Sequence, residues 1–120
     1  SGLTATIDIT GAKGLPLTYV NSAFAAFFGY RADEVLGRPV ITLLFPEAGG
    51  AASMFNEAPA RLLMRARRKD GASAEVELSI GMVHGVDGHL THWVLAFADR
   101  SDIARMQEEL RVLRAIAAAP

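Results

Sequence analysis

The most regular pattern of apolar and polar positions lies in the segment "ASAEVELSIGMVH", where the two kinds of residue alternate. A period of two sends neighbouring side chains to opposite faces of a strand, so this segment predicts a strand with one buried face. The polar side of the alternation carries Glu75, Glu77 and Ser79. The apolar, inward side is formed by Ala74, Val76, Leu78, Ile80 and Met82.

Two further extended segments flank this strand, "RLLMRARR" before it and "LTHWVLAFA" after it. Each separator contains an Asp-Gly pair, which is a strong hairpin signal because the turn requires positive φ. We therefore expect an antiparallel meander of three strands. Arg65 and Arg67 are expected to face Glu75 and Glu77 across its first hairpin.

The first half of the chain predicts two short strands, "LTATIDIT" and "LTYV", followed by several short helices. Asn21 is expected to cap the helix "SAFAAFF", and Gly29 to end it in a left-handed conformation. A second helix, "RADEVL", is followed by helical turns within "RPVITLLFPEAGG" and by a short helix over residues 51–57. The resulting order of strands, helices, strands and a terminal helix predicts an α+β fold.

After Asp99 the apolar spacing changes to that of an amphipathic helix with a coiled-coil seam. Glu109 and Arg114 then fall at g and e positions, where they attract each other in a parallel two-stranded coil. Only about two heptads are present, so a helix that packs on its own domain is the alternative. The a and d positions of the predicted seam are Ile103, Met106, Leu110, Leu113 and Ala117.

Composition narrows the possible functions. With 120 residues and a net charge of −1, the chain predicts a globular domain with no electrostatic preference for nucleic acid or anionic membrane. It contains no cysteine, which excludes disulfides and cysteine nucleophiles. No phosphate-binding loop, G-x-S-x-G elbow or H-E-x-x-H motif is present, so we predict a non-catalytic domain. Because the chain starts without methionine or a leader, we expect an excised, cytoplasmic piece of a longer protein.

The segments "LTYVNSAFAAFFGYRADEVLGR", "RRKDG" and "ADRSD" occur in the order typical of the PAS sensor domain, which the chain resembles along nearly its whole length. It is most similar to the light-oxygen-voltage branch of that family, through "LPLTYVNSAF", "RKDG", "ELSI" and "DGHLTHWV". The resemblance implies a five-stranded antiparallel sheet with short helices on one face. It also implies a sensor core over residues 1–99, a signalling helix over 100–120, and a pocket between helices and sheet.

Light-oxygen-voltage photoreceptors place a reactive cysteine after "LGR", and here Val40 occupies that position. In that branch two asparagines and a glutamine also contact the flavin. The resemblance implies that Ala66, Val76 and Phe97 occupy their positions in this chain. A buried polar ring without partners loses roughly 1–3 kcal/mol per missing hydrogen bond, so we predict no flavin and no other cofactor. The inward-facing apolar side chains of the sheet either fill the core or surround a small apolar ligand. The pocket-lining positions are Val40, Ala66, Val76, Leu78, Leu95 and Phe97.

The sequence offers few residues for a haem or a metal ion. A haem sensor needs an axial ligand near residues 51–58, where only Met54 is available. His89 and His92 lie close to Asp87, but a solvated hairpin explains them better than a metal site does. We predict neither haem nor metal.

The resemblance implies a module of a bacterial signalling protein, with a histidine kinase as the commonest parent. We expect a homodimer that relays changes through the terminal helix to an output domain. A ligand-free dimerisation scaffold is the alternative, and a flavin or haem sensor is a weaker one. The outer sheet face is apolar where solvent would favour polar residues, so a partner or the terminal helix is expected to cover it. The residues of this face are Val83, Val94, Ala96 and Ala98.

Overall fold

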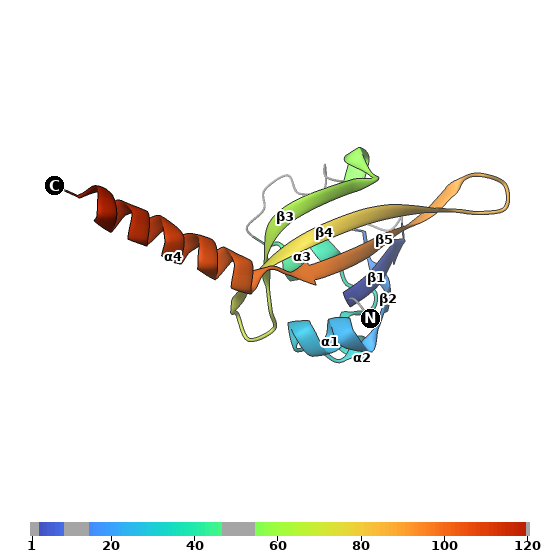
Figure 1. Cartoon of the computed structure of the whole chain (residues 1–120). Helices are drawn as coiled ribbons and strands as arrows, with labels where there is room; N and C mark the ends of the chain where they lie inside the picture. The colour runs from blue at the N-terminus through green and yellow to red at the C-terminus, as the bar shows by residue number, and fades with distance from the viewer. Residues whose placement is uncertain (1–2, 9–14, 47–54, 120) are drawn as a thin grey trace.

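Five strands form one antiparallel sheet, which is the body of the molecule (Figure 1). The computed structural model describes residues 3–8, 15–46 and 55–119. In chain order the elements are β1 (Leu3–Asp8), β2 (Leu17–Val20), α1 (Ser22–Phe28), α2 (Ala32–Val35), α3 (Val40–Leu44), β3 (Ala60–Arg67), β4 (Ser73–His84), β5 (Leu90–Asp99) and α4 (Ser101–Ala118). The spatial order β2-β1-β5-β4-β3 confirms the predicted five-stranded antiparallel α+β fold.

The predicted meander of β3, β4 and β5 is present, and β1 returns to pair with the last strand. Leu78 of β4 lies opposite Phe97 of β5, and Ile80 lies opposite Leu95. On its other edge β5 pairs with β1, where Ala5 faces the same Leu95. β5 is therefore the central strand, held by backbone hydrogen bonds along both edges.

The short helices lie together on one face of the sheet (Figure 1). Asn21 caps α1 as predicted, since its side-chain oxygen accepts the backbone N–H of Phe24 at 2.9 Å. Gly29 ends the helix with φ +82°, a left-handed conformation that glycine adopts without a Cβ clash. The spacing of four residues between Phe24 and Phe28 puts both rings on the side of α1 that packs into the core.

The terminal helix α4 leaves the sheet and extends away from it, at the end opposite the β4–β5 hairpin (Figure 1). These two projections account for the length of 64 Å against a width of 29 Å. No residue of α4 is buried. The alternative in which this helix packs along its own domain is therefore wrong, because only its beginning reaches β4.

Two local predictions need correction. Arg65 does pair with Glu75, at 2.9 Å, but Arg67 lies opposite Ser73. Glu77 instead meets Arg61 and Arg100. The reason is the register, because a five-residue connection between β3 and β4 places position 67 next to the turn. Of the predicted helix over 51–57, residues 51–54 lie outside the described residues. Residues 55–57 form a 3₁₀ turn.

Candidate functional site

The interior between helices and sheet is the position at which relatives are expected to hold a cofactor. All six pocket-lining positions predicted from the sequence are buried, and they come from α3, β3, β4 and β5. Among the described residues, no polar or charged residue is classed as buried. The six residues are Val40, Ala66, Val76, Leu78, Leu95 and Phe97.

Phe97 joins an aromatic cluster within this interior. Its ring centroid lies 5.7 Å from that of Phe24 and 5.5 Å from that of Phe28, in edge-to-face arrangements. The two α1 rings are themselves 4.7 Å apart. Such contacts add attraction to the burial of apolar area, so Phe97 bridges β5 and α1 and occupies space at the centre of the domain.

Trp93 lies on the same strand, about 13 Å from Phe97 along β5. Its ring stacks near that of Phe55, with centroids 5.0 Å apart. The indole Nε1 is buried and has no hydrogen-bond partner among the residues that the structure describes. This single N–H donor cannot replace the three polar side chains that contact the flavin in light-oxygen-voltage domains, because a flavin ring has several polar edges that each need a partner.

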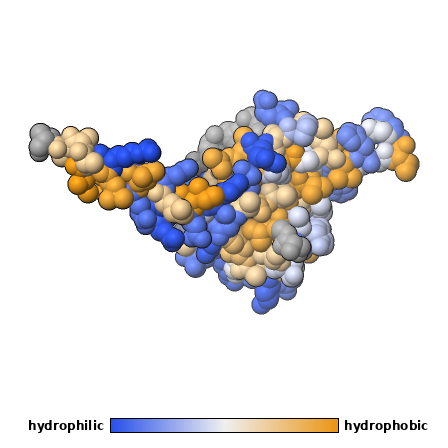
Figure 2. Space-filling model, in the orientation of Figure 1, coloured by the Kyte–Doolittle hydropathy of each residue, from blue (hydrophilic) through white to orange (hydrophobic). Residues whose placement is uncertain are grey.

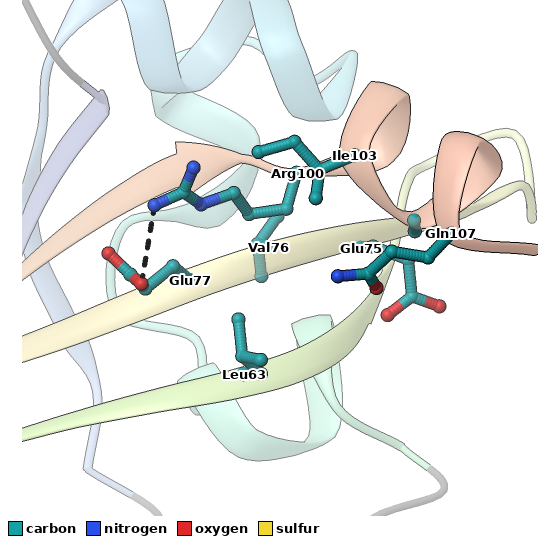
Figure 3. Close-up of a pocket in the computed structure, with 8 residues that line it drawn as sticks. Leu63, Glu75, Val76, Glu77, Arg100, Ile103 and Gln107 are labelled. Atoms are coloured by element: carbon teal, nitrogen blue, oxygen red, sulfur yellow. Dashed lines mark hydrogen bonds and ion pairs between the residues drawn. The ribbon is translucent and has the colours of Figure 1, made fainter. Parts of the chain in front are cut away.

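A second region of interest is the junction between β5, β4 and α4 (Figure 3). The backbone N–H of Arg100 donates to the carbonyl of Glu75 at 2.7 Å. The Arg100 guanidinium lies 3.4 Å from the carboxylate of Glu77, whose other oxygen is 3.8 Å from Arg61. The residue that precedes α4 is thus fastened to β4 by its main chain and its side chain.

Asp99 completes the start of α4. Its carboxylate accepts the backbone N–H of Ser101 at 2.9 Å, and this hydrogen bond holds the pKa of Asp99 below its usual value. A negative charge at this position also matches the positive end of the helix.

A groove of about 270 Å³ opens beside this junction (Figure 3). Leu63 of β3 and Ile103 of α4 line it, together with the buried Val76. Val76 therefore belongs both to the apolar interior and to the groove. A change in packing within the core has a short path to the first turn of α4.

The predicted seam residues form an exposed apolar stripe on α4 (Figure 2). Ile103, Leu110 and Leu113 border a shallow hollow of about 460 Å³ along this helix. Arg114 has no acidic side chain within ion-pair distance among the described residues, and Glu109 has only a 3.9 Å contact with Arg105. The helix thus presents an unpaired cation and a weakly paired anion beside its apolar stripe.

The predicted outer-face residues do share one face of the sheet. Val94 lies opposite Gly81, and Val83 lies opposite His92, so the alternation places both valines on the side away from the helices. Ala98 is exposed, while Val94 and Ala96 are partly exposed. A partner or the terminal helix was expected to cover this face. α4 does not cover it, so the partner stays as the prediction.

Leu63 is a surface residue that the sequence-based site prediction missed. Its side chain is 75% exposed, although it lies within a strand and directly opposite Glu77. A signal was available, because Leu62 and Leu63 are adjacent and neighbouring strand residues face opposite sides. One of the two leucines had to point outward.

Asp87, His89 and His92 lie on and beside the β4–β5 hairpin. Asp87 and His89 lie 3.2 Å apart on the exposed hairpin, while His92 contacts the hydroxyl of Thr91. Within the described ranges, no three side chains of metal-binding type are grouped. Met54 lies outside the described residues. A search of the described helices finds none with the length and hydropathy needed to cross a membrane.

Comparison with known proteins identifies the family. The sequence profile of the PAS domain matches residues 6–102. Adagio-like protein 3 of Oryza sativa subsp. japonica is 37% identical over 92 residues, which cover 64% of this chain and 15% of that protein. The chain therefore spans only a small part of that relative.

Solved structures agree with this assignment. An RNA-binding light-oxygen-voltage receptor has a TM-score of 0.79 and 28% identity, with 97% of this chain and 34% of that chain covered. The light-state structure of the blue-light photoreceptor Aureochrome1 LOV shares the fold, with a TM-score of 0.71, 18% identity and coverage of 92% and 91%. The chain belongs to the PAS domain family, and the solved structures that it resembles include light-oxygen-voltage domains.

Proposed function

We propose that this chain is a flavin-free PAS regulatory module that forms a parallel homodimer through α4 and relays changes in its sheet to an output domain. The PAS sensory fold supports a role in signalling without catalysis by the domain itself. The observation that carries the proposal is the attachment of Arg100, the residue before α4, to Glu75 and Glu77 of β4. A displacement of the central strands must therefore move the start of this helix.

The route from interior to helix is short. Phe97 packs in the core, and Arg100 follows three residues later, about 10 Å along an extended chain. Val76 touches the groove at the same junction from the neighbouring strand. Changes in core packing or in a bound partner would reach α4 through these two strands.

The surface of α4 supports the dimer. A helix of 18 residues spans about 27 Å and, in this structure, leaves its apolar stripe in solvent. In a parallel pair, Arg114 of each helix faces the partner's Glu109, which gives Arg114 an acidic partner and adds a second cation beside Glu109. A second copy of the chain therefore satisfies both the apolar and the charged features.

The residues in the cofactor position do not fit a flavin. Val40 carries no thiol, and Ala66, Val76 and Phe97 offer no hydrogen-bonding group to the ring. The aromatic cluster around Phe97 also takes up space in the same interior. We therefore assign no light-driven or redox step to this domain.

The wider assignment follows from the family resemblance. We place the domain in the cytoplasm, in a bacterial signalling protein whose output domain lies beyond the terminal helix, with a histidine kinase favoured as that output. A ligand-free scaffold that sets the spacing of its neighbours is the second candidate. The packed Phe24, Phe28 and Phe97 cluster favours it, because it leaves a small apolar ligand little space in that part of the interior.

The helix pairing can be tested with Ile103→Cys, which introduces a single thiol into a chain that has no cysteine. In a parallel, in-register dimer the two copies of position 103 lie in the same layer of the seam, so mild oxidation is expected to give a covalent dimer. Non-reducing electrophoresis measures its yield. Glu108→Cys, on the far side of the same helix, should remain largely monomeric, and equal yields from both variants would contradict the assigned pairing.

A further inference from the structure

The outward-facing Leu63 has no covering group within the described part of its own chain. Its neighbours on the outer face of β3 turn toward acidic residues of β4, with Arg65 2.9 Å from Glu75 and Arg61 3.8 Å from Glu77. These ion pairs draw the long side chains away and leave the leucine in solvent. Protein interfaces typically have an apolar centre surrounded by a polar rim, and Leu63 with the ion pairs around it matches this arrangement.

The apolar surface around Leu63 continues onto α4. Leu63 and Ile103 line the same groove, as Figure 3 shows. Ile103 and Gln107 also border the hollow that runs along α4 past Leu110. One apolar surface thus extends from the outer face of β3 to the exposed stripe of the helix.

We propose that the groove between Leu63 and Ile103 is covered by the first turns of the partner's α4 in the homodimer. This inference rests on the proposed dimeric function and adds β3 to its interface. In a parallel coil, a g position faces the e position five residues further along the partner helix. The partner's Asp102 therefore faces Gln107, which lines this groove.

A second copy of this chain is favoured over another occupant by the charges on α4. The same g-to-e relation that brings the partner's Asp102 to Gln107 also brings the partner's Glu109 to Arg114. Arg114 has no acidic partner of its own among the described residues. Both contacts arise from one arrangement, which places the start of the partner helix beside Gln107 and so beside the groove that Leu63 also lines.

The interface assignment predicts that Leu63→Glu weakens dimerisation about tenfold, because it removes apolar contact at the margin of the seam and adds charge there. Sedimentation equilibrium over a series of protein concentrations gives the dissociation constant. Val86→Glu is the matched control, since Val86 is a fully exposed apolar residue in the connection between β4 and β5. Circular dichroism confirms that each variant is folded.

A second measurement does not depend on a disruptive substitution. Leu63→Cys provides the only thiol in the chain, and its rate of modification by a soluble maleimide reports access to the groove. The rate is expected to fall at least about fivefold as protein concentration rises through the dimerisation range. A rate that does not depend on concentration overturns the inference, whether the groove is open or covered by something other than a second copy.

The failure of this inference can be separated from failure of the dimer itself. If Leu110→Glu yields monomers while Leu63→Glu dimerises like the unaltered chain, the coil stands and the participation of β3 is wrong. If Leu110→Glu leaves the dimer intact, the proposed helix pairing is wrong and the groove assignment falls with it. Weakening by both variants, with Val86→Glu unaffected, supports the extended interface.

Discussion

The Leu110→Glu variant is expected to be monomeric at concentrations at which the unaltered chain is a dimer. Leu110 occupies a central a position, so both copies of its side chain lie in the seam of the proposed coil. Each buried leucine contributes about 2 kcal/mol, and the loss of two copies corresponds to roughly a thousandfold weaker dimerisation. Two carboxylates brought together in one layer add repulsion to this loss.

The control is Val112→Glu, which introduces the same charge on the same helix. Val112 is an exposed apolar residue at a c position, outside the a and d stripe. Analytical ultracentrifugation of the two variants side by side should therefore show a monomer for Leu110→Glu and an unaltered dimer for Val112→Glu. If both substitutions weaken the dimer equally, α4 associates by general hydrophobicity and the heptad assignment must be abandoned.

Replacement of Phe97 by alanine is expected to lower the free energy of unfolding by about 3–5 kcal/mol, the usual cost of removing a large core side chain. Phe97 is 5% exposed and contacts the rings of Phe24 and Phe28. Urea denaturation measures the effect. Tyr19→Ala serves as the control, because this tyrosine is largely exposed and its removal should cost much less.

The same variant tests whether the interior is filled. Phe97→Ala leaves space for a small apolar molecule, so benzene is expected to raise its melting temperature, whereas the unaltered domain should show no such stabilisation. Stabilisation of both proteins would mean that a cavity already exists and would favour the ligand-binding sensor. A loss below about 1 kcal/mol in Phe97→Ala would show that this ring does not hold the core together.

The parts of the fold that follow from local periodicity could be predicted from the sequence. Alternation in β4 and the Asp-Gly turns on either side of it define the β3–β4–β5 meander, since both signals arise between neighbouring residues. The pairing of β1 with β5 joins segments almost ninety positions apart and was not predicted, since the family resemblance implied only a five-stranded antiparallel sheet. Composition and spacing do not encode that contact, because it depends on how the helices fold over the sheet.

The candidate site also contains features that could be predicted from the sequence and features that could not. The inward positions of β4 followed from alternation, and Val76 is buried as that pattern requires. Phe97 was placed in the pocket by the family resemblance and is also buried. The contact of Arg100 with Glu77 did not follow, because it depends on the direction in which α4 leaves the sheet. The place of Leu63 in a surface groove was missed, because that groove forms only where Ile103 of α4 comes beside β3.

Native mass spectrometry of the purified domain, recorded with its absorbance spectrum, tests the pairing of α4 and the exclusion of flavin together. We expect a colourless dimer with twice the mass of the bare polypeptide, because α4 pairs and the interior does not accept a flavin. A monomer would contradict the proposed pairing through α4. A dimer that carries the mass and the visible absorption of a flavin would contradict the assignment of Ala66, Val76 and Phe97 as residues that exclude it.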